Sequence, residues 1–165
     1  MKEKILISAC LMGFPVRYNQ SDKPLRSALL ERWQQEERLI VHCPELAAGL
    51  ETPRLPAELT GGQGADALAG GAKIREVDGS DVTPHYLLAA WLALKTAQEN
   101  HCRFAIMTDG SPTCGSSRIY DGTFQGKTIA GEGVAAALLR QHGIEVFAEH
   151  QMAALAQRLV EVESV

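Results

Sequence analysis

Short apolar runs alternate with amphipathic segments along the chain, and this order restricts the fold more than any other feature of the sequence. The apolar runs cover residues 4–9, 39–42, 104–107 and 145–148, and helical periodicity covers residues 24–37, 82–100, 134–141 and 151–162. Continuous apolar runs are typical of strands that are buried on both faces of a parallel sheet. The alternation therefore predicts an α/β fold, a small Rossmann-like three-layer domain with a mostly parallel sheet of about four strands.

Two long segments interrupt this alternation. Residues 45–79 are rich in Gly, Ala and Pro and lack a clean period, so we predict a long functional loop with a short helical turn and a small hairpin at 73–77. Residues 108–133 are predicted to form a second long loop. The glycine-rich stretch 61–71 fails a dinucleotide-binding motif because Ala67 occupies the third glycine position, and we interpret it as flexible. No repeat or linker is visible, so residues 1–165 are predicted to be a single domain.

Charge and hydropathy exclude several function classes. The net charge is −4 and the pI is near 5.7, whereas a protein that coats nucleic acid normally carries a basic excess. We therefore expect no stable nucleic-acid binding. The apolar stretches are too short for a membrane span or a signal peptide, which predicts a cytoplasmic protein with no membrane partner. The sequence predicts no particular oligomeric state.

The predicted topology sorts the four cysteines into a group of three and one bystander. Cys10 follows the first strand, Cys43 ends the second, and Cys114 lies in the loop that leaves the third. Carboxyl ends of parallel strands meet at one edge of a sheet, where ligands bind, so these three thiols are expected to share a site. Cys102 precedes the third strand and belongs to the opposite edge.

Three chemistries suit three such thiols. They could hold zinc with a fourth ligand, or three irons of a [4Fe-4S] cluster whose fourth iron stays open. Their spacing matches neither CxxC-type zinc modules nor ferredoxin motifs. A metal-free phosphatase or reductase that depends on Cys10 is the third alternative, but Arg17 comes one residue too late for a Cys-x5-Arg loop and Pro15 removes an amide donor.

A further pair of residues is a candidate for substrate contact. Gly131 and Gly133 open the helix in "GEGVAAALL", and the free amides at such a helix start could face an anion or a polar substrate. A packing turn before the helix is the alternative interpretation of the same two glycines.

Four blocks together resemble one family. "SACLMGFPVRYN", "CPELAAGLETPRLPAE", "DGSPTCGSSRIYDGTF" and "GEGVAAALL" are similar to the bacterial thiouracil desulfidase family. The resemblance implies a Rossmann-like domain with a [4Fe-4S] cluster on Cys10, Cys43 and Cys114. It also implies a small-molecule substrate, a thiolated base or nucleoside such as 2-thiouracil, whose sulfur binds the open iron. Two positions depart from the common pattern: Val16 stands where many relatives have a further cysteine, and Asn19-Gln20 where they have Asp-Gly.

The resemblance implies a hydrolytic desulfuration that replaces sulfur by oxygen and releases sulfide. Proton transfers need a general acid-base group, and Glu45, two residues beyond Cys43, is the first candidate, followed by Ser111 and Asp109.

Other residues are assigned to substrate binding or set aside. Arg17 and Arg54 are expected to bind substrate, unless Arg54 pairs with Glu58, and Tyr18 to stack on a pyrimidine. His42 is expected to point away from the site.

Two other functions remain open beside desulfuration. They are a non-catalytic iron-sulfur or sulfur-carrier module in nucleoside thiolation, and a zinc-dependent hydrolase at the same cysteines.

Overall fold

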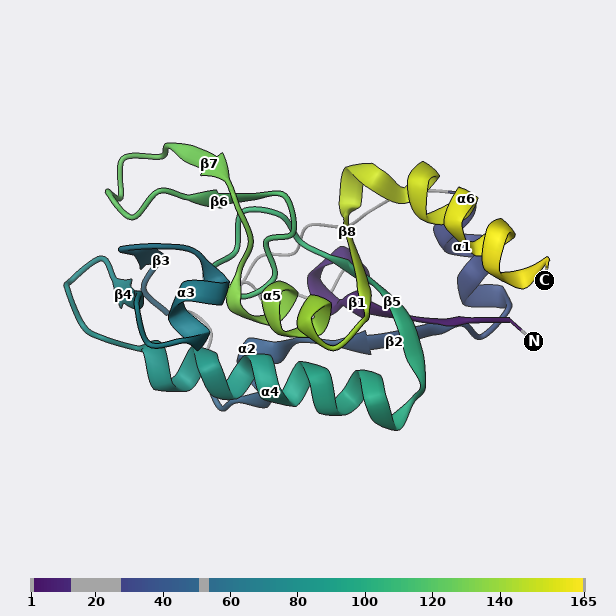
Figure 1. Ribbon diagram of the computed structural model, residues 1–165, viewed down its shortest axis with the longest axis horizontal. Coiled ribbons are helices and arrows are strands. Elements are labelled where there is room, and N and C mark those ends of the chain that lie inside the picture. Colours follow the sequence, from purple (N-terminus) through teal and green to yellow (C-terminus); the bar gives the residue numbers. More distant parts are fainter. Residues whose placement is uncertain (1, 13–27, 51–53, 165) are drawn as a thin grey trace.

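The central sheet has four parallel strands in the order β2-β1-β5-β8. The computed structural model describes residues 2–12, 28–50 and 54–164. The sheet strands are β1 (Lys4–Ser8), β2 (Leu39–His42), β5 (Cys102–Met107) and β8 (Glu145–Ala148). Adjacent strands pair in register, with Ile7 opposite Val41 on one side and Ile106 on the other. The predicted parallel α/β domain is thereby confirmed (Figure 1).

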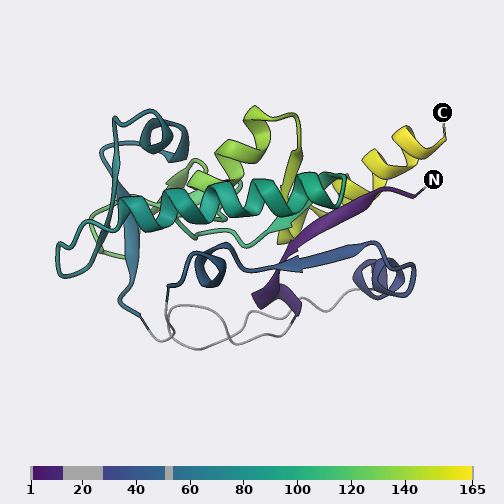
Figure 2. The ribbon, with the colours of Figure 1, turned by 90° about the horizontal axis from the view of Figure 1, so that it is seen from below.

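Helices cover both faces of this sheet. The described helices that flank it are α1 (Ala28–Gln35), α4 (Thr83–Glu99), α5 (Val134–Gln141) and α6 (Met152–Glu163). Side chains alternate across β1, so that Ile5 and Ile7 pack with α1 and α6 in one core, whereas Leu6 packs with α4 and α5 in the other. Figure 2 shows α4 and α1 on opposite sides of the sheet. No helix in the described ranges is long and apolar enough to span a bilayer.

The described part of the segment before α4 contains four short elements, so the prediction of a long loop over 45–79 with one helical turn is wrong where these elements form. They are α2 (Pro44–Ala47), β3 (Ala57–Thr60), α3 (Gly64–Leu68) and β4 (Lys73–Glu76). β4 pairs with β3, which lies well upstream, and not within a local hairpin at 73–77. The glycine-rich stretch forms α3, whose start is closed by a hydrogen bond from the Gln63 amide to Asp66 Oδ2 at 2.8 Å.

The second predicted loop contains another two-stranded ribbon, β6 (Arg118–Tyr120) with β7 (Thr128–Ala130). Both ribbons lie at the end of the molecule opposite the two termini (Figure 1). Short 3-10 turns, η1 (Ala9–Met12) and η2 (Glu149–Gln151), follow β1 and β8. The ribbons therefore stand beyond the carboxyl edge of the sheet, where topology places the site.

Candidate functional site

A cavity of about 360 Å³ opens at the carboxyl edge of the sheet. Its floor is formed by the residues that end β1, β2 and β5, and its far wall by the two ribbons. The thiol-bearing and polar lining residues are Ser8, Cys10, His42, Cys43, Glu45, Arg54, Glu58, Tyr86, Thr108, Asp109, Ser111, Cys114 and Tyr120. The cavity is thus built where the strand order predicts a ligand.

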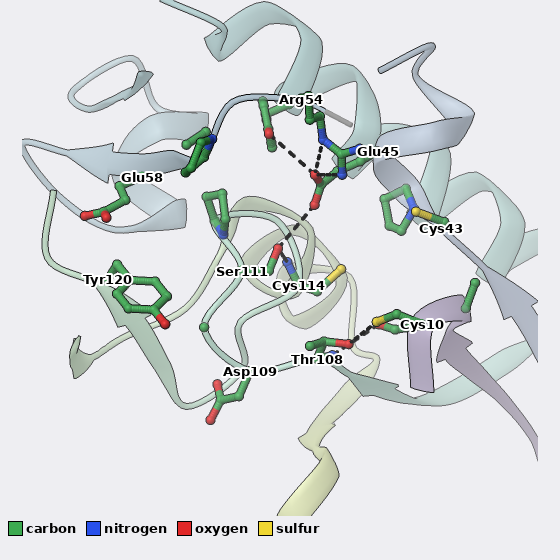
Figure 3. Close-up of a pocket in the computed structure, with 18 of the residues that line it drawn as sticks. Cys10, Cys43, Glu45, Arg54, Glu58, Thr108, Asp109, Ser111, Cys114 and Tyr120 are labelled. Atoms are coloured by element: carbon green, nitrogen blue, oxygen red, sulfur yellow. Dashed lines mark hydrogen bonds and ion pairs between the residues drawn. The ribbon is translucent and has the colours of Figure 1, made fainter. Parts of the chain in front are cut away.

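Three thiols face this cavity from three different strand ends. Cys10 lies in η1, Cys43 lies between β2 and α2, and Cys114 lies in the turn that follows β5. Figure 3 shows their sulfur atoms directed toward a common space. Cys102 is buried at the start of β5, in the core under α4 and α5. The structure therefore brings together the three thiols that topology grouped and separates the fourth.

Burial favours the protonated form of Cys43 and Cys114 when no metal is bound. Desolvation raises the pKa of Cys114 well above its ordinary value, and the neighbouring Glu45, Cys43 and Cys10 raise it further. Burial also raises the pKa of Cys43. A bound metal would have to displace these protons, because only the thiolate is a ligand.

The donor set tests which metal group the residues fit. Three soft sulfur donors come to the cavity from three separate strand ends. Thiolates suit both zinc and iron-sulfur clusters, and in a [4Fe-4S] cluster each of the three would bond a different iron, which would leave the fourth iron open.

His42 is among the residues that line the same cavity. Its Nε2 is buried and has no hydrogen-bond partner among the described residues, and burial lowers the pKa of its imidazole. The expectation that its side chain points away from the site stays a prediction.

Glu45 is held beside the thiols by three side chains. Arg54 forms an ion pair with it and donates from Nε to Oε1 at 3.1 Å. Tyr86 donates its hydroxyl to Oε1 at 3.4 Å, and Ser111 donates to Oε2 at 3.3 Å. Glu45 and Arg54 are largely buried, at 13% and 8% exposure. Arg54 thus pairs with Glu45 and not with Glu58 (Figure 3).

Ser111 connects this carboxylate to the turn that carries Cys114. Its Oγ accepts hydrogen bonds from the Thr113 and Cys114 amides at 3.0 and 3.1 Å. Because the oxygen accepts these two bonds, its proton is directed to Glu45. The position of the Glu45 carboxylate is therefore tied to that of the Cys114 backbone.

Asp109 organises the chain and does not point at the thiols. Its carboxylate accepts hydrogen bonds from the Ser116, Ser117 and Arg118 amides, the last at 2.8 Å. Burial raises the pKa of Asp109, but these bonds and that from the Ser117 hydroxyl lower it more strongly. Figure 3 shows its carboxylate turned away from the sulfurs, so its geometry is that of a turn residue.

Gly131 and Gly133 do not line the cavity. The amides at the start of α5 are already used, since Val134 donates to the Pro112 carbonyl and Ala135 to the Thr113 carbonyl, both at 2.9 Å. A Cβ at Gly133 would lie 2.5 Å from the Thr113 carbonyl oxygen. Gly133 therefore allows the Cys114 turn to pack on the start of α5, whereas a Cβ at Gly131 would meet the Gln63 side chain at 3.0 Å. The structure supports the alternative interpretation, a packing turn, over the prediction that the two glycines contact substrate.

Two predicted substrate-binding residues, Arg17 and Tyr18, lie outside the described residues. Conversely, Ser8, Thr108, Tyr86, Glu58 and Tyr120 line the cavity without having been predicted. Ser8 ends β1 and Thr108 directly follows β5, so the rule that grouped the cysteines at the strand ends could have found them. Tyr86 reaches the site from a helix, where its helical spacing indicated only a core residue.

Comparison with known proteins gives consistent matches. Residues 5–151 match the family model described as 2-thiouracil desulfurase. An uncharacterized protein of Bacillus subtilis (strain 168), YbbK, is 45% identical over 148 residues, which cover 90% of this chain and 97% of that protein. The solved structure of [4Fe-4S]-dependent thiouracil desulfidase TudS is 46% identical, with a TM-score of 0.86 and coverage of 96% of this chain and 98% of the other.

Proposed function

Since the chain belongs to the 2-thiouracil desulfurase family, we propose that it is a [4Fe-4S]-dependent enzyme that hydrolyses a thiolated pyrimidine to the oxo base and sulfide. The observation that carries this proposal is the convergence of three thiols, two of them buried, and one carboxylate, Glu45, on a single cavity. The resemblance seen in the sequence named the same family and the same cofactor.

Cys10, Cys43 and Cys114 are the proposed cluster ligands. A [4Fe-4S] cluster held by three thiolates supplies a Lewis acid with affinity for the substrate's sulfur. The overall reaction is balanced by water alone: 2-thiouracil and water give uracil and hydrogen sulfide. The C=S bond is replaced by a C=O bond, both water hydrogens leave with the sulfur, and no net electron transfer occurs.

Glu45 is the proposed general base and acid. Its carboxylate takes a proton from the attacking water and returns it to the departing sulfur. Arg54 holds Glu45 Oε1 in place, and Ser111 holds Oε2 at the side of Cys114. The buried ion pair orients the carboxylate before substrate arrives, which lowers the cost of reaching the reactive geometry. Asp109 keeps the Cys114 turn in shape and carries no proton in this scheme.

We propose a free thiolated base or nucleoside as substrate and the cytoplasm as the site of action. Glu45, Glu58 and Asp109 line the cavity, and Arg54 is the one cationic side chain among its described lining residues. Because Arg54 is already paired with Glu45, this lining favours an uncharged base over a phosphate backbone. None of the four cysteines forms a disulfide, as is usual in a reducing compartment.

The test is turnover in isotopically labelled water. Protein reconstituted with iron and sulfide without oxygen is incubated with 2-thiouracil in H₂¹⁸O. We expect uracil and sulfide in equal amounts, with one ¹⁸O atom in each uracil. A loaded protein that releases no sulfide would instead be a non-catalytic iron-sulfur or sulfur-carrier module. Equal activity of iron-free, zinc-loaded protein would identify a zinc hydrolase.

A further inference from the structure

Two buried hydroxyl groups lie beneath the thiols and have no part in the proposed proton transfers. Ser8 ends β1, and Thr108 follows directly on β5. Their exposed fractions are 4% and 6%, and both line the cavity. β1 and β5 are neighbours in the sheet, so the two side chains stand side by side at its carboxyl edge.

Thr108 contacts Cys10 directly. Its Oγ1 lies 2.8 Å from Cys10 Sγ (Figure 3). Between a thiol and a hydroxyl either atom can donate the proton. A metal-bound thiolate carries no proton, so in the loaded protein the Thr108 hydroxyl must be the donor.

Ser8 fixes the backbone that carries this hydroxyl. Its Oγ accepts a hydrogen bond from the Thr108 amide at 3.1 Å, which holds the start of the segment after β5 against the end of β1. The Thr108 hydroxyl is therefore positioned at Cys10 by a second buried contact.

We propose that Thr108 is a positioning residue that donates an O–H···S hydrogen bond to the cluster ligand Cys10 and thereby raises the electron affinity of the cluster. This inference rests on the proposed function. A donor at a thiolate sulfur withdraws negative charge from the attached iron, which strengthens it as a Lewis acid and makes oxidation of the cluster harder. An enzyme that uses its cluster without electron transfer benefits from both effects.

The test compares three variants by potentiometric titration of the reconstituted cluster. Thr108→Val keeps the shape of the side chain and removes the hydroxyl, whereas Thr108→Ser keeps the hydroxyl. Thr113→Val is the matched control, because the buried Thr113 Oγ1 has no partner among the described residues although it adjoins Cys114. The readout is the midpoint potential of the cluster, which is independent of turnover.

We expect Thr108→Val to lower the equilibrium constant for cluster reduction roughly tenfold, a shift of about −59 mV for one electron. Thr108→Ser should keep most of the wild-type potential, and Thr113→Val should leave it unchanged. If Thr108→Val loses the cluster and Thr108→Ser loads normally, the inference is also supported, because Ser keeps the hydroxyl that Val lacks.

Three results would overturn the inference. They are an unchanged potential in Thr108→Val, an equal shift in Thr113→Val, and failure of both Thr108 variants to take up a cluster that Thr113→Val holds. In all three the wild-type protein still carries its cluster, so the proposed function stands. If the wild-type protein takes up no cluster, the proposed function and this inference fail together.

Discussion

Two walls of one cavity differ in how the chain builds them. The thiol wall, Ser8, Cys10, Cys43, Thr108 and Cys114, stands at the strand ends of a sheet buried on both faces. The ribbon wall, Pro56, Ala57, Glu58 and Tyr120, belongs to the two ribbons or adjoins them. The ribbons are joined across a long stretch of sequence, since Glu58 Oε1 accepts hydrogen bonds from the Gly122 and Phe124 amides at 2.9 and 3.3 Å. The contrast indicates that reaction chemistry sits on the rigid sheet and that recognition is left to the ribbons.

Substitutions in the thiol wall are expected to have the largest effects on cluster loading and activity. We expect Cys10→Ala, Cys43→Ala and Cys114→Ala each to abolish cluster loading and sulfide release, because two thiolates cannot replace three ligands. Cys102→Ala is the matched control, since Cys102 lies at the opposite edge of the sheet. Iron content and visible absorbance measure loading. A fully loaded Cys43→Ala protein would remove that residue from the ligand set.

A pair of carboxylates, one on each side of the cavity, separates chemistry from recognition. Glu45→Gln should lower kcat by about 10²- to 10⁴-fold, the usual range for loss of a general acid-base group, with the cluster retained. Glu58→Gln keeps an oxygen that can accept from Gly122 and Phe124, so we expect mainly a change in KM. Steady-state kinetics on 2-thiouracil distinguish the two. Equal losses of kcat in both variants would contradict the division between the walls.

Gly64 tests how firmly the ribbon end is coupled to the turn that carries Cys114. A Cβ at Gly64 would lie 2.2 Å from the carbonyl oxygen of Gly133, which packs on the Thr113 carbonyl. Gly64→Ala is therefore expected to lower the free energy of unfolding by about 1–3 kcal/mol. At Gly71, in the same segment, the nearest atom to such a Cβ would be the Asp66 carbonyl oxygen at 3.6 Å, so Gly71→Ala is the tolerated control. Denaturant titration compares them, and equal stabilities would show that the two ends are not tightly packed.

Asp109, which ties the Cys114 turn to β6, should give the smallest effect and a dependence on pH. Hydrogen bonds lower the pKa of its carboxyl in the folded protein below the unfolded value near 3.9. Its stabilisation is therefore present above that value and is lost as pH falls through the folded pKa. Asp109→Asn should lower the free energy of unfolding by about 1 kcal/mol at neutral pH, and the deficit should shrink below pH ~4. Urea unfolding at several pH values measures it, and a constant deficit down to pH ~2 would contradict this role.

The two walls also differ in how well the sequence predicts them. β2, α5 and β8 were predicted to the residue, because a segment with continuous or strongly periodic apolar side chains needs no remote partner to define it. The same topology grouped the three cysteines. The ribbons depend on partners far along the chain, as when the Gly64 amide donates to the Glu132 carbonyl at 2.9 Å, and such pairs leave no local pattern.

Individual site residues follow the same division. Glu45 and Ser111 were chosen because they lie close in sequence to Cys43 and Cys114, and the structure joins them by a hydrogen bond. The pairing of Arg54 with Glu45 could not be predicted, since it depends on where α2 turns after Pro44.

The central claim is that this chain holds a [4Fe-4S] cluster on the thiol wall. Its most direct test is the iron, zinc and acid-labile sulfide content of the wild-type protein, purified and reconstituted without oxygen. We expect about four irons and about four sulfides per chain and no zinc. One zinc per chain with no iron or sulfide would contradict the claim.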